Sequence, residues 1–352
     1  MFDTQPRGAA ATLFAMFCCI PVFAPAQAQV CAPPDSLPKT ISAVRLHAYG
    51  GPEQLHLDSI PRPQAGPGEV LIKVDSASIN PIDWKLREGR AQNWWPLKLP
   101  AVVGRDASGT VVALGTGVDD FHCGDAVVVL ADSDSGTFAE YIVAAGNVVA
   151  PKPTKLSFVE AAAYPLVALT AWDGLVETGQ VQAGERVLIH GGAGGVGSMA
   201  VQIAKARGAH VIATASARNR EFLLGIGADE VIDYTRTRFE DAVHDVDLVF
   251  DTVGGDTLSR SPAVLVPGGR LVTIAGSISA QACSKAGIVC PPEKNGTPRD
   301  GLRQLGKLID GGALRINVDA EYPLSAAGAA QERNREGHTR GKIVIRVAKD
   351  AI

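Results

Sequence analysis

The chain has 352 residues, of which 46% are hydrophobic and 20% are charged, and its formal net charge is −4. This length favours two domains over one, and the composition is that of a globular protein rather than a disordered one. The slightly acidic balance argues against a nucleic-acid-binding surface and against a basic patch for membrane lipids.

The first 28 residues predict an export signal. Arg7 lies in a short n-region, and residues 9–24 form a mostly apolar h-region. Ala26-Gln27-Ala28 then offers the small residues that a signal peptidase needs. The apolar stretch is too short to serve as a stable membrane anchor. We therefore expect a periplasmic or secreted protein. A cytoplasmic protein is the alternative, because the sequence has no twin-arginine pair to direct export of an already folded chain.

Two of the six cysteines leave with this signal, and Cys31, Cys123, Cys283 and Cys290 remain. They form no CxxC pair, so a structural zinc site is not expected. Cys283 and Cys290 are near enough in sequence to close a small loop. In an oxidising compartment they form either a disulfide or two free thiols, and spacing alone leaves both open.

After a polar, proline-rich leader over 29–41, residues 42–160 predict a β-rich domain. Short apolar runs at 70–74, 110–114 and 125–130 alternate with turn signals such as Pro67-Gly68. From residue 161 the period changes, and strands alternate with helices up to about residue 312. This alternation predicts parallel βαβ units with right-handed crossovers. The last forty residues return to strand character and include a run at 342–347.

A glycine-rich motif lies between a strand at 187–190 and a helix that begins near residue 196. The motif G-x-G-x-x-G covers 192–197, and its members Gly192, Gly194, Gly195, Val196 and Gly197 are the expected cofactor-binding residues. Glycines permit the tight turn and the close approach of the backbone to a pyrophosphate. The helix N-terminus adds free N–H groups and partial positive charge.

The strand after this helix is followed by Ser216-Ala217-Arg218-Asn219, and no acidic residue occurs between Gly197 and Arg220. An NAD site normally places Asp or Glu here, to bind the ribose hydroxyls. A hydroxyl and a cation suit a 2′-phosphate instead, so Ser216 and Arg218 favour NADPH over NADH. The alternative is that Arg218 only caps a solvated helix start.

Several motifs in a fixed order resemble one protein family. They are Asn80–Lys85, Gly104–Gly109, Leu169–Trp172, the glycine motif, Gly227–Tyr234 and Arg340–Lys342. With these motifs, residues 42–350 resemble the zinc-independent NADPH:quinone oxidoreductases, the zeta-crystallin-like branch of the medium-chain dehydrogenase/reductase superfamily.

The resemblance implies an α/β protein with two domains and an active site between them. A GroES-like β-rich catalytic domain is expected from 42–160 and 313–352, and a Rossmann domain with a doubly wound parallel sheet from 161–312. It also implies NADPH, hydride transfer to a small quinone or enone, and a homodimer. Further contacts implied are Tyr234 at the 2′-phosphate, Asn80 and Thr170 near the nicotinamide, Gly276 and Ser277 beside its ring, and Lys342.

No metal site is expected. Zinc alcohol dehydrogenases of this superfamily carry Gly-His-Glu where this chain has Gly104-Arg105-Asp106, and the seven histidines show no H-x-x-x-H spacing. In this motif, Asp106 is either a structural ion-pair partner of Arg105 or a catalytic group.

Without zinc, hydrogen-bond donors must stabilise negative charge on the substrate oxygen, and Asn80 and Lys85 are the catalytic candidates. The alternative for Lys85 is a surface lysine, solvated or paired with Asp83 or Glu88. Two other functions stay open: a cofactor-binding redox sensor or structural protein with little turnover, and an enoyl-thioester reductase. The absence of tyrosine between residues 76 and 109 weakens the reductase alternative.

Overall fold

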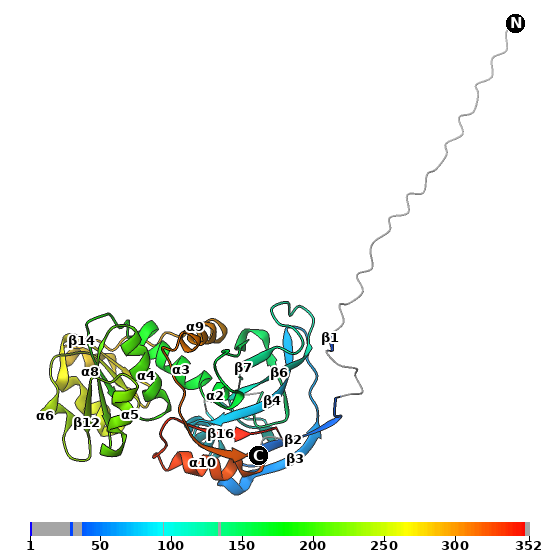
Figure 1. The fold of residues 1–352 in the computed structure, drawn as a ribbon, viewed down its shortest axis with the longest axis horizontal. Helices are drawn as coiled ribbons and strands as arrows, with labels where there is room; N and C mark the ends of the chain where they lie inside the picture. Colours follow the sequence, from blue (N-terminus) through cyan, green and yellow to red (C-terminus); the bar gives the residue numbers. More distant parts are fainter. Residues whose placement is uncertain (2–28, 31–36, 94, 133–134, 349–352) are drawn as a thin grey trace.

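The computed structural model describes residues 1, 29–30, 37–93, 95–132 and 135–348 (Figure 1). The predicted export signal lies outside the described residues apart from Met1, and so does the stretch 31–36 of the leader. Within the described part of the chain, no helix has the length and apolar character needed to cross a bilayer.

The larger sheet has eight strands and is built from both ends of the chain. Its order is β15-β16-β4-β6-β7-β9, with β1 paired to β6 and β8 paired to β4. The strands are β1 (Gln29–Val30), β4 (Glu69–Ile79), β6 (Asp106–Leu114), β7 (Ala126–Leu130), β8 (Tyr141–Ala145), β9 (Val149–Pro151), β15 (Val318–Pro323) and β16 (Lys342–Arg346). Figure 1 shows β16, near the C-terminus, beside β4 of the N-terminal half.

A small antiparallel sheet in the order β3-β2-β5 completes the β-rich half. Its strands are β2 (Thr40–Leu46), β3 (Leu55–Pro61) and β5 (Ala101–Val102). Strand β4 is longer than the predicted run at 70–74, because small residues carry it on to Ile79 between two neighbouring strands. This extension brings Asn80 to the end of a central strand.

The second large sheet has five parallel strands in the order β12-β11-β10-β13-β14. They are β10 (Arg186–His190), β11 (His210–Ala215), β12 (Glu230–Asp233), β13 (Val246–Asp251) and β14 (Leu265–Thr273). The central strands read as continuous apolar runs because both of their faces are covered, and Val187, Leu188 and Ile189 are all fully buried. The predicted α/β class, with a GroES-like and a Rossmann part, is confirmed.

Ten α-helices are described: α1 (Pro81–Arg87), α2 (Phe158–Ala162), α3 (Pro165–Trp172), α4 (Gly195–Ala206), α5 (Arg220–Gly225), α6 (Phe239–Ala242), α7 (Gly255–Arg260), α8 (Ala280–Lys285), α9 (Pro298–Asp310) and α10 (Ala327–Arg335). One hydrophobic cluster crosses from the first sheet to the second: it includes Val128 of β7, Leu169 of α3 and Val187 of β10. The predicted domain boundaries at 160/161 and 312/313 stay predictions.

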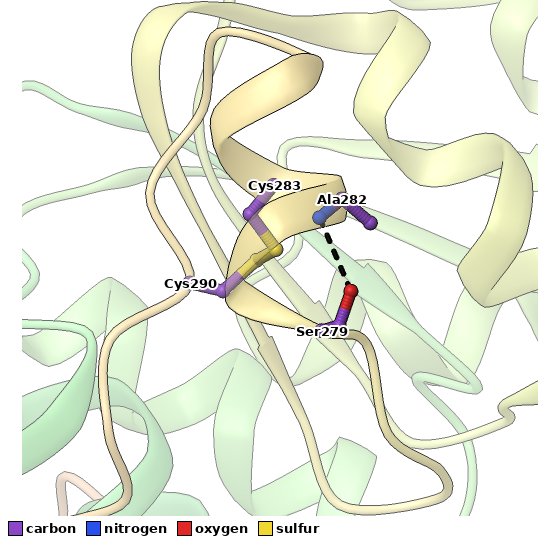
Figure 2. The surroundings of a disulfide bond; sticks show 4 residues. All are labelled: Ser279, Ala282, Cys283 and Cys290. Atoms are coloured by element: carbon purple, nitrogen blue, oxygen red, sulfur yellow. Dashed lines mark hydrogen bonds between the residues drawn. A yellow bond between two sulfur atoms is a disulfide. The ribbon is translucent and has the colours of Figure 1, made fainter.

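Cys283 and Cys290 form a disulfide with an S–S distance of 2.01 Å (Figure 2). This decides between the two alternatives that the sequence left open. The bond joins α8 to the segment that lies along β14, where Val289 N donates to Gly269 O (2.8 Å). The disulfide therefore fixes the chain that covers one edge of the parallel sheet. Cys123 is disulfide-bonded as well.

Candidate active site and nucleotide site

The glycine motif forms the turn between β10 and α4, as predicted. Gly191 has a φ of 71°, in the left-handed region. A Cβ on Gly197 would lie 2.2 Å from Gly191 O, so only glycine lets the helix start this close to the strand. A Cβ on Gly194 would meet only Gly191 O, at 3.4 Å. The turn therefore leaves space in front of the first N–H groups of α4, where a pyrophosphate fits.

A buried histidine lies under this turn, and no motif in the sequence points to a role for it. His190 Nδ1 lies 3.2 Å from Thr214 Oγ1, and the same oxygen accepts a hydrogen bond from Gly191 N (3.2 Å). Burial lowers the pKa of His190 to about 4. The histidine is therefore neutral at physiological pH and supports the turn through hydrogen bonds alone.

The predicted 2′-phosphate residues come together at the end of β11. Ser216 Oγ accepts a hydrogen bond from Asn219 Nδ2 (3.3 Å), and the exposed Arg218 donates to His338 O (3.0 Å). Tyr234 follows β12, and its backbone N donates to Ala215 O (3.3 Å). The Tyr234 side chain is 61% exposed. All three side chains are thus available to a ligand at this edge.

Lys342 is the first residue of β16, and its side chain is buried between the two halves of the molecule. Its Nζ donates to Ile79 O (2.7 Å) and to Asn80 Oδ1 (2.6 Å). Its aliphatic part packs on the glycine motif, since a Cβ on Gly195 would lie 3.2 Å from Lys342 Cδ. One lysine therefore joins the nucleotide turn to the predicted catalytic residue Asn80.

The Asp106 carboxylate is fully buried and holds this arrangement together. Its Oδ2 accepts from Ser78 Oγ (2.9 Å) and from Asn80 Nδ2 (2.8 Å), and Lys342 Nζ lies 3.5 Å away. Its Oδ1 accepts from Leu166 N (2.9 Å) at the start of α3. The carboxylate therefore fixes the buried Asn80 amide in one orientation, and the second hydrogen of this amide is not used by Asp106.

Of the two alternatives for Asp106, the ion pair with Arg105 is not formed among the described residues. Arg105 Nε donates to Ala131 O (2.7 Å), and its guanidinium lies over the Trp95 ring, 4.9 Å from the centroid. The two side chains diverge at the start of β6: Asp106 is its first residue and is fully buried, while Arg105 precedes the strand.

Asp83 is a second buried carboxyl beside this group. Its Oδ2 accepts from Asn80 N (2.7 Å) in a capping box at the start of α1, and its Oδ1 has no hydrogen-bond partner. Burial is the main cause that raises the pKa of Asp83 from 3.8 to about 7, and nearby Lys342 opposes the rise. Near neutral pH this carboxyl therefore takes up and releases a proton next to Asn80.

The raised pKa of Asp83 makes stability depend on pH. Between about pH 4 and pH 7 the folded chain keeps a proton that the unfolded chain has released, so raising the pH favours unfolding. We expect the stability of the native chain relative to Asp83→Asn to fall by about 3 kcal/mol over this window and to stay constant above it.

Urea unfolding of both proteins at several pH values measures this difference. Asp119→Asn removes an exposed carboxyl and is the matched control. For this variant we expect the difference in unfolding free energy from the native chain to stay the same at every pH. If the difference for Asp83→Asn also did not change with pH, Asp83 would be charged in the folded chain throughout this pH window.

The structure does not bring Lys85 to Asn80. Lys85 is exposed on α1, and its Nζ lies 5.6 Å from the centroid of the Trp84 ring. Thr170, in α3, donates to Leu166 O (2.8 Å). Gly276 and Ser277 are exposed and follow β14. In the described ranges, no three His, Cys, Asp or Glu side chains lie close enough together to hold a metal ion.

Comparisons with known proteins agree with this arrangement. Residues 66–154 match the alcohol dehydrogenase GroES-like domain, and residues 226–345 match the zinc-binding dehydrogenase family. The chloroplastic NADPH-dependent alkenal/one oxidoreductase of Arabidopsis thaliana is 35% identical over 88% of this chain and 80% of the relative. The chain belongs to the quinone oxidoreductase branch of the medium-chain dehydrogenase/reductase superfamily.

Solved structures of this superfamily match nearly the whole described chain. The quinone oxidoreductase from Coxiella burnetii has a TM-score of 0.79 and 36% identity, covering 88% of this chain and 100% of that one. A mycobacterial protein solved in complex with NADPH has a TM-score of 0.75 and 30% identity, covering 87% of this chain and 100% of that one.

In this member of the superfamily, the close approach at Gly197 gives a direct test of the nucleotide turn. Gly197→Ala places a Cβ 2.2 Å from Gly191 O, so the turn has to shift away from α4. We expect a loss of about 2 kcal/mol in stability and at least a tenfold weaker affinity for NADPH. Gly225→Ala is the matched control, since its added Cβ meets nothing within 4 Å. Equal NADPH affinities in the two variants would contradict the assignment.

Proposed function

We propose that the protein is an NADPH-dependent oxidoreductase that transfers a hydride to a quinone or to an α,β-unsaturated carbonyl, without zinc. The observation that carries the proposal is the position of Lys342. Its stem packs on Gly195 of the nucleotide turn while its ammonium donates to Asn80 Oδ1 (2.6 Å). Named relatives that reduce alkenals and quinones support the same reaction class.

The cofactor fits the residues that the chain provides. The turn 191–197 and the start of α4 hold the pyrophosphate, and Ser216, Arg218 and Tyr234 bind the 2′-phosphate. Thr170, Gly276 and Ser277 border the nicotinamide end. When bound, NADPH supplies the hydride.

Side chains of the protein stabilise the negative charge that develops on the substrate oxygen. The Asn80 amide has one hydrogen left to donate, and the buried Lys342 ammonium makes the potential around it positive. Lys342 has a pKa lowered by burial, while Asp106 and Asp83 favour its charged form. The expected role of Lys85 stays a prediction, and its substitution is compared with that of Lys342 below.

Zinc independence is supported by the hydrogen bonds that the Asp106 carboxylate accepts. It stands where zinc-dependent relatives carry an acidic motif residue, and both of its oxygens accept hydrogen bonds from this chain's own donors. Metal analysis of the purified protein tests this directly, and one equivalent of zinc that is needed for turnover would overturn it.

The reaction is tested with purified protein of residues 29–352. Oxidation of NADPH and of NADH is followed with 1,4-benzoquinone, 9,10-phenanthrenequinone and an alkenal as acceptors. We expect turnover with NADPH, little with NADH, and the active acceptor decides between quinone and enone. Binding of NADPH without turnover of any acceptor would favour the redox-sensor alternative, and turnover of an enoyl thioester alone would favour the thioester reductase.

A homodimer is part of the proposal. The segment paired with the edge strand β14 carries an exposed apolar residue, Val289, with 48% of its surface accessible to a second chain. Sedimentation of the purified protein tests this assembly. A species of one chain mass at micromolar concentration would contradict it.

Export is supported by the cysteines. A disulfide joins Cys283 and Cys290, and Cys123 is disulfide-bonded too, which is typical of oxidising compartments. We expect a mature chain that begins at Gln29, with no thiol labelled by an alkylating reagent under denaturing conditions. Mass spectrometry of the cell fractions measures both properties. An unprocessed cytoplasmic chain with free thiols would favour the alternative location.

A further inference from the structure

The segment 338–342 of the C-terminal part of the chain lies along the whole nucleotide site. At one end His338 O accepts from Arg218 (3.0 Å). In the middle Gly341 N donates to Ala193 O (3.0 Å) within the glycine motif. At the other end Lys342 donates to Asn80. One short segment thus contacts the predicted 2′-phosphate, pyrophosphate and nicotinamide ends.

Arg340 occupies the 2′-phosphate end of this segment. Its Nε donates to Asn219 Oδ1 (2.9 Å) and its Nη2 donates to Arg218 O (3.1 Å). Its guanidinium lies 5.5 Å from the centroid of the Phe222 ring, which supports it from the Rossmann side. The side chain is therefore held over the loop that follows β11, which also carries Ser216.

Arg218 and Arg340 lie beside the same loop without a carboxylate partner among the described residues. Across the described ranges, neither Arg218 nor Arg340 has a carboxylate within ion-pair distance, and both use neutral backbone or amide oxygens as acceptors. The acid at the end of β12, Asp233, accepts from Thr235 Oγ1 (2.7 Å) and lies 3.7 Å from Arg236. The two arginines therefore create a positive potential that is not neutralised within the chain.

We propose that Arg340 is a specificity-determining residue, which together with Arg218 binds the 2′-phosphate of the cofactor from the catalytic domain. The inference rests on the proposed function. A phosphate monoester carries nearly two negative charges at neutral pH and offers three oxygens, so it satisfies two guanidinium groups at once. A ribose with free hydroxyls offers neither this charge nor these acceptors.

The same geometry ties cofactor identity to the catalytic residues. Arg340 precedes Lys342 by two residues, and Gly341 between them has a φ of 80°. A Cβ on Gly341 would lie 2.2 Å from Asn317 O, so the backbone between Arg340 and Lys342 is closely packed. A phosphate bound by Arg340 therefore restrains the segment that places the Lys342 ammonium against Asn80.

The test measures binding of 2′,5′-ADP and of 5′-AMP by calorimetry on residues 29–352. Arg340→Ala is expected to weaken 2′,5′-ADP about tenfold or more and to change 5′-AMP by less than about twofold. Arg340→Lys retains the charge but loses the planar fork, so an intermediate loss is expected. Arg303→Ala, an exposed arginine on α9, is the matched control.

A purely structural role for Arg340 predicts a different result, because a disturbed loop would weaken both ligands alike. Equal losses for the two ligands, or no loss for either, overturns the proposal. Arg218→Ala and the double variant add a second check: two arginines on one phosphate give losses that are not additive. Because no electron acceptor takes part, these affinities are informative even if the proposed reduction of quinones or enones is not found.

Discussion

Replacing Lys342 by Met is expected to lower kcat/KM with the best acceptor by about 100-fold. Methionine retains the length and the apolar stem that packs on Gly195, but removes the ammonium from a site that is 5% exposed. A charge in such a water-poor place acts strongly on a developing oxyanion, because little solvent screens it. Asn80 also loses the donor that fixes its amide oxygen. Steady-state kinetics at saturating NADPH measure the effect.

The affinity for 2′,5′-ADP separates this loss from a general disturbance of the fold, since it reports on the other end of the cofactor site. Lys307→Met, an exposed lysine on α9, is the control and is expected to leave kcat/KM unchanged. Lys85→Met is expected to lower kcat/KM less than Lys342→Met, because its exposed charge is screened by water and salt. A larger loss of kcat/KM for Lys85→Met than for Lys342→Met would mean that Lys85 stabilises the oxyanion.

The nucleotide half of the site could be read from the sequence because its signals are local. The glycine motif, the strand before it and the helix after it all lie between Arg186 and Ala206, and each step follows from backbone geometry. Ser216 and Arg218 are also found locally, at the end of the next strand. Cys283 and Cys290 are local too, but a disulfide needs a Cα separation that only the fold fixes.

The catalytic half could not be read in this way. Asp106, Asn80 and Lys342 are separated by up to 262 residues along the chain, and only the pairing of β16 with β4 brings them together. Asn80 and Lys342 were expected near the cofactor from the family resemblance, but their shared contact with Asp106 was not, since buried lysines and aspartates are rare and the default expectation places them in solvent. Lys85 was the nearer candidate in sequence, but the period of α1 turns its side chain outward.

The second large effect is expected for Asp106→Asn, which should lose about 4 kcal/mol of stability. Both oxygens of the native carboxylate accept hydrogen bonds: Oδ1 from Leu166 N, and Oδ2 from Ser78 and Asn80. An amide has only one acceptor oxygen, so in either orientation its NH₂ group faces a donor. The substitution also leaves the buried Lys342 without its nearest negative charge.

Urea unfolding followed by circular dichroism measures this loss, and a thermodynamic cycle identifies its cause. If the unpaired ammonium contributes, the double variant Asp106→Asn with Lys342→Met is less destabilised than the sum of the single variants. Strictly additive losses would mean that the hydrogen bonds from Ser78, Asn80 and Leu166 account for the whole effect. Asp119→Asn, at an exposed position, is expected to change stability by less than about 0.5 kcal/mol. The Asp106 carboxylate both stabilises the fold and orients Asn80. We therefore expect Asp106→Asn to lower the free energy of unfolding and kcat/KM together.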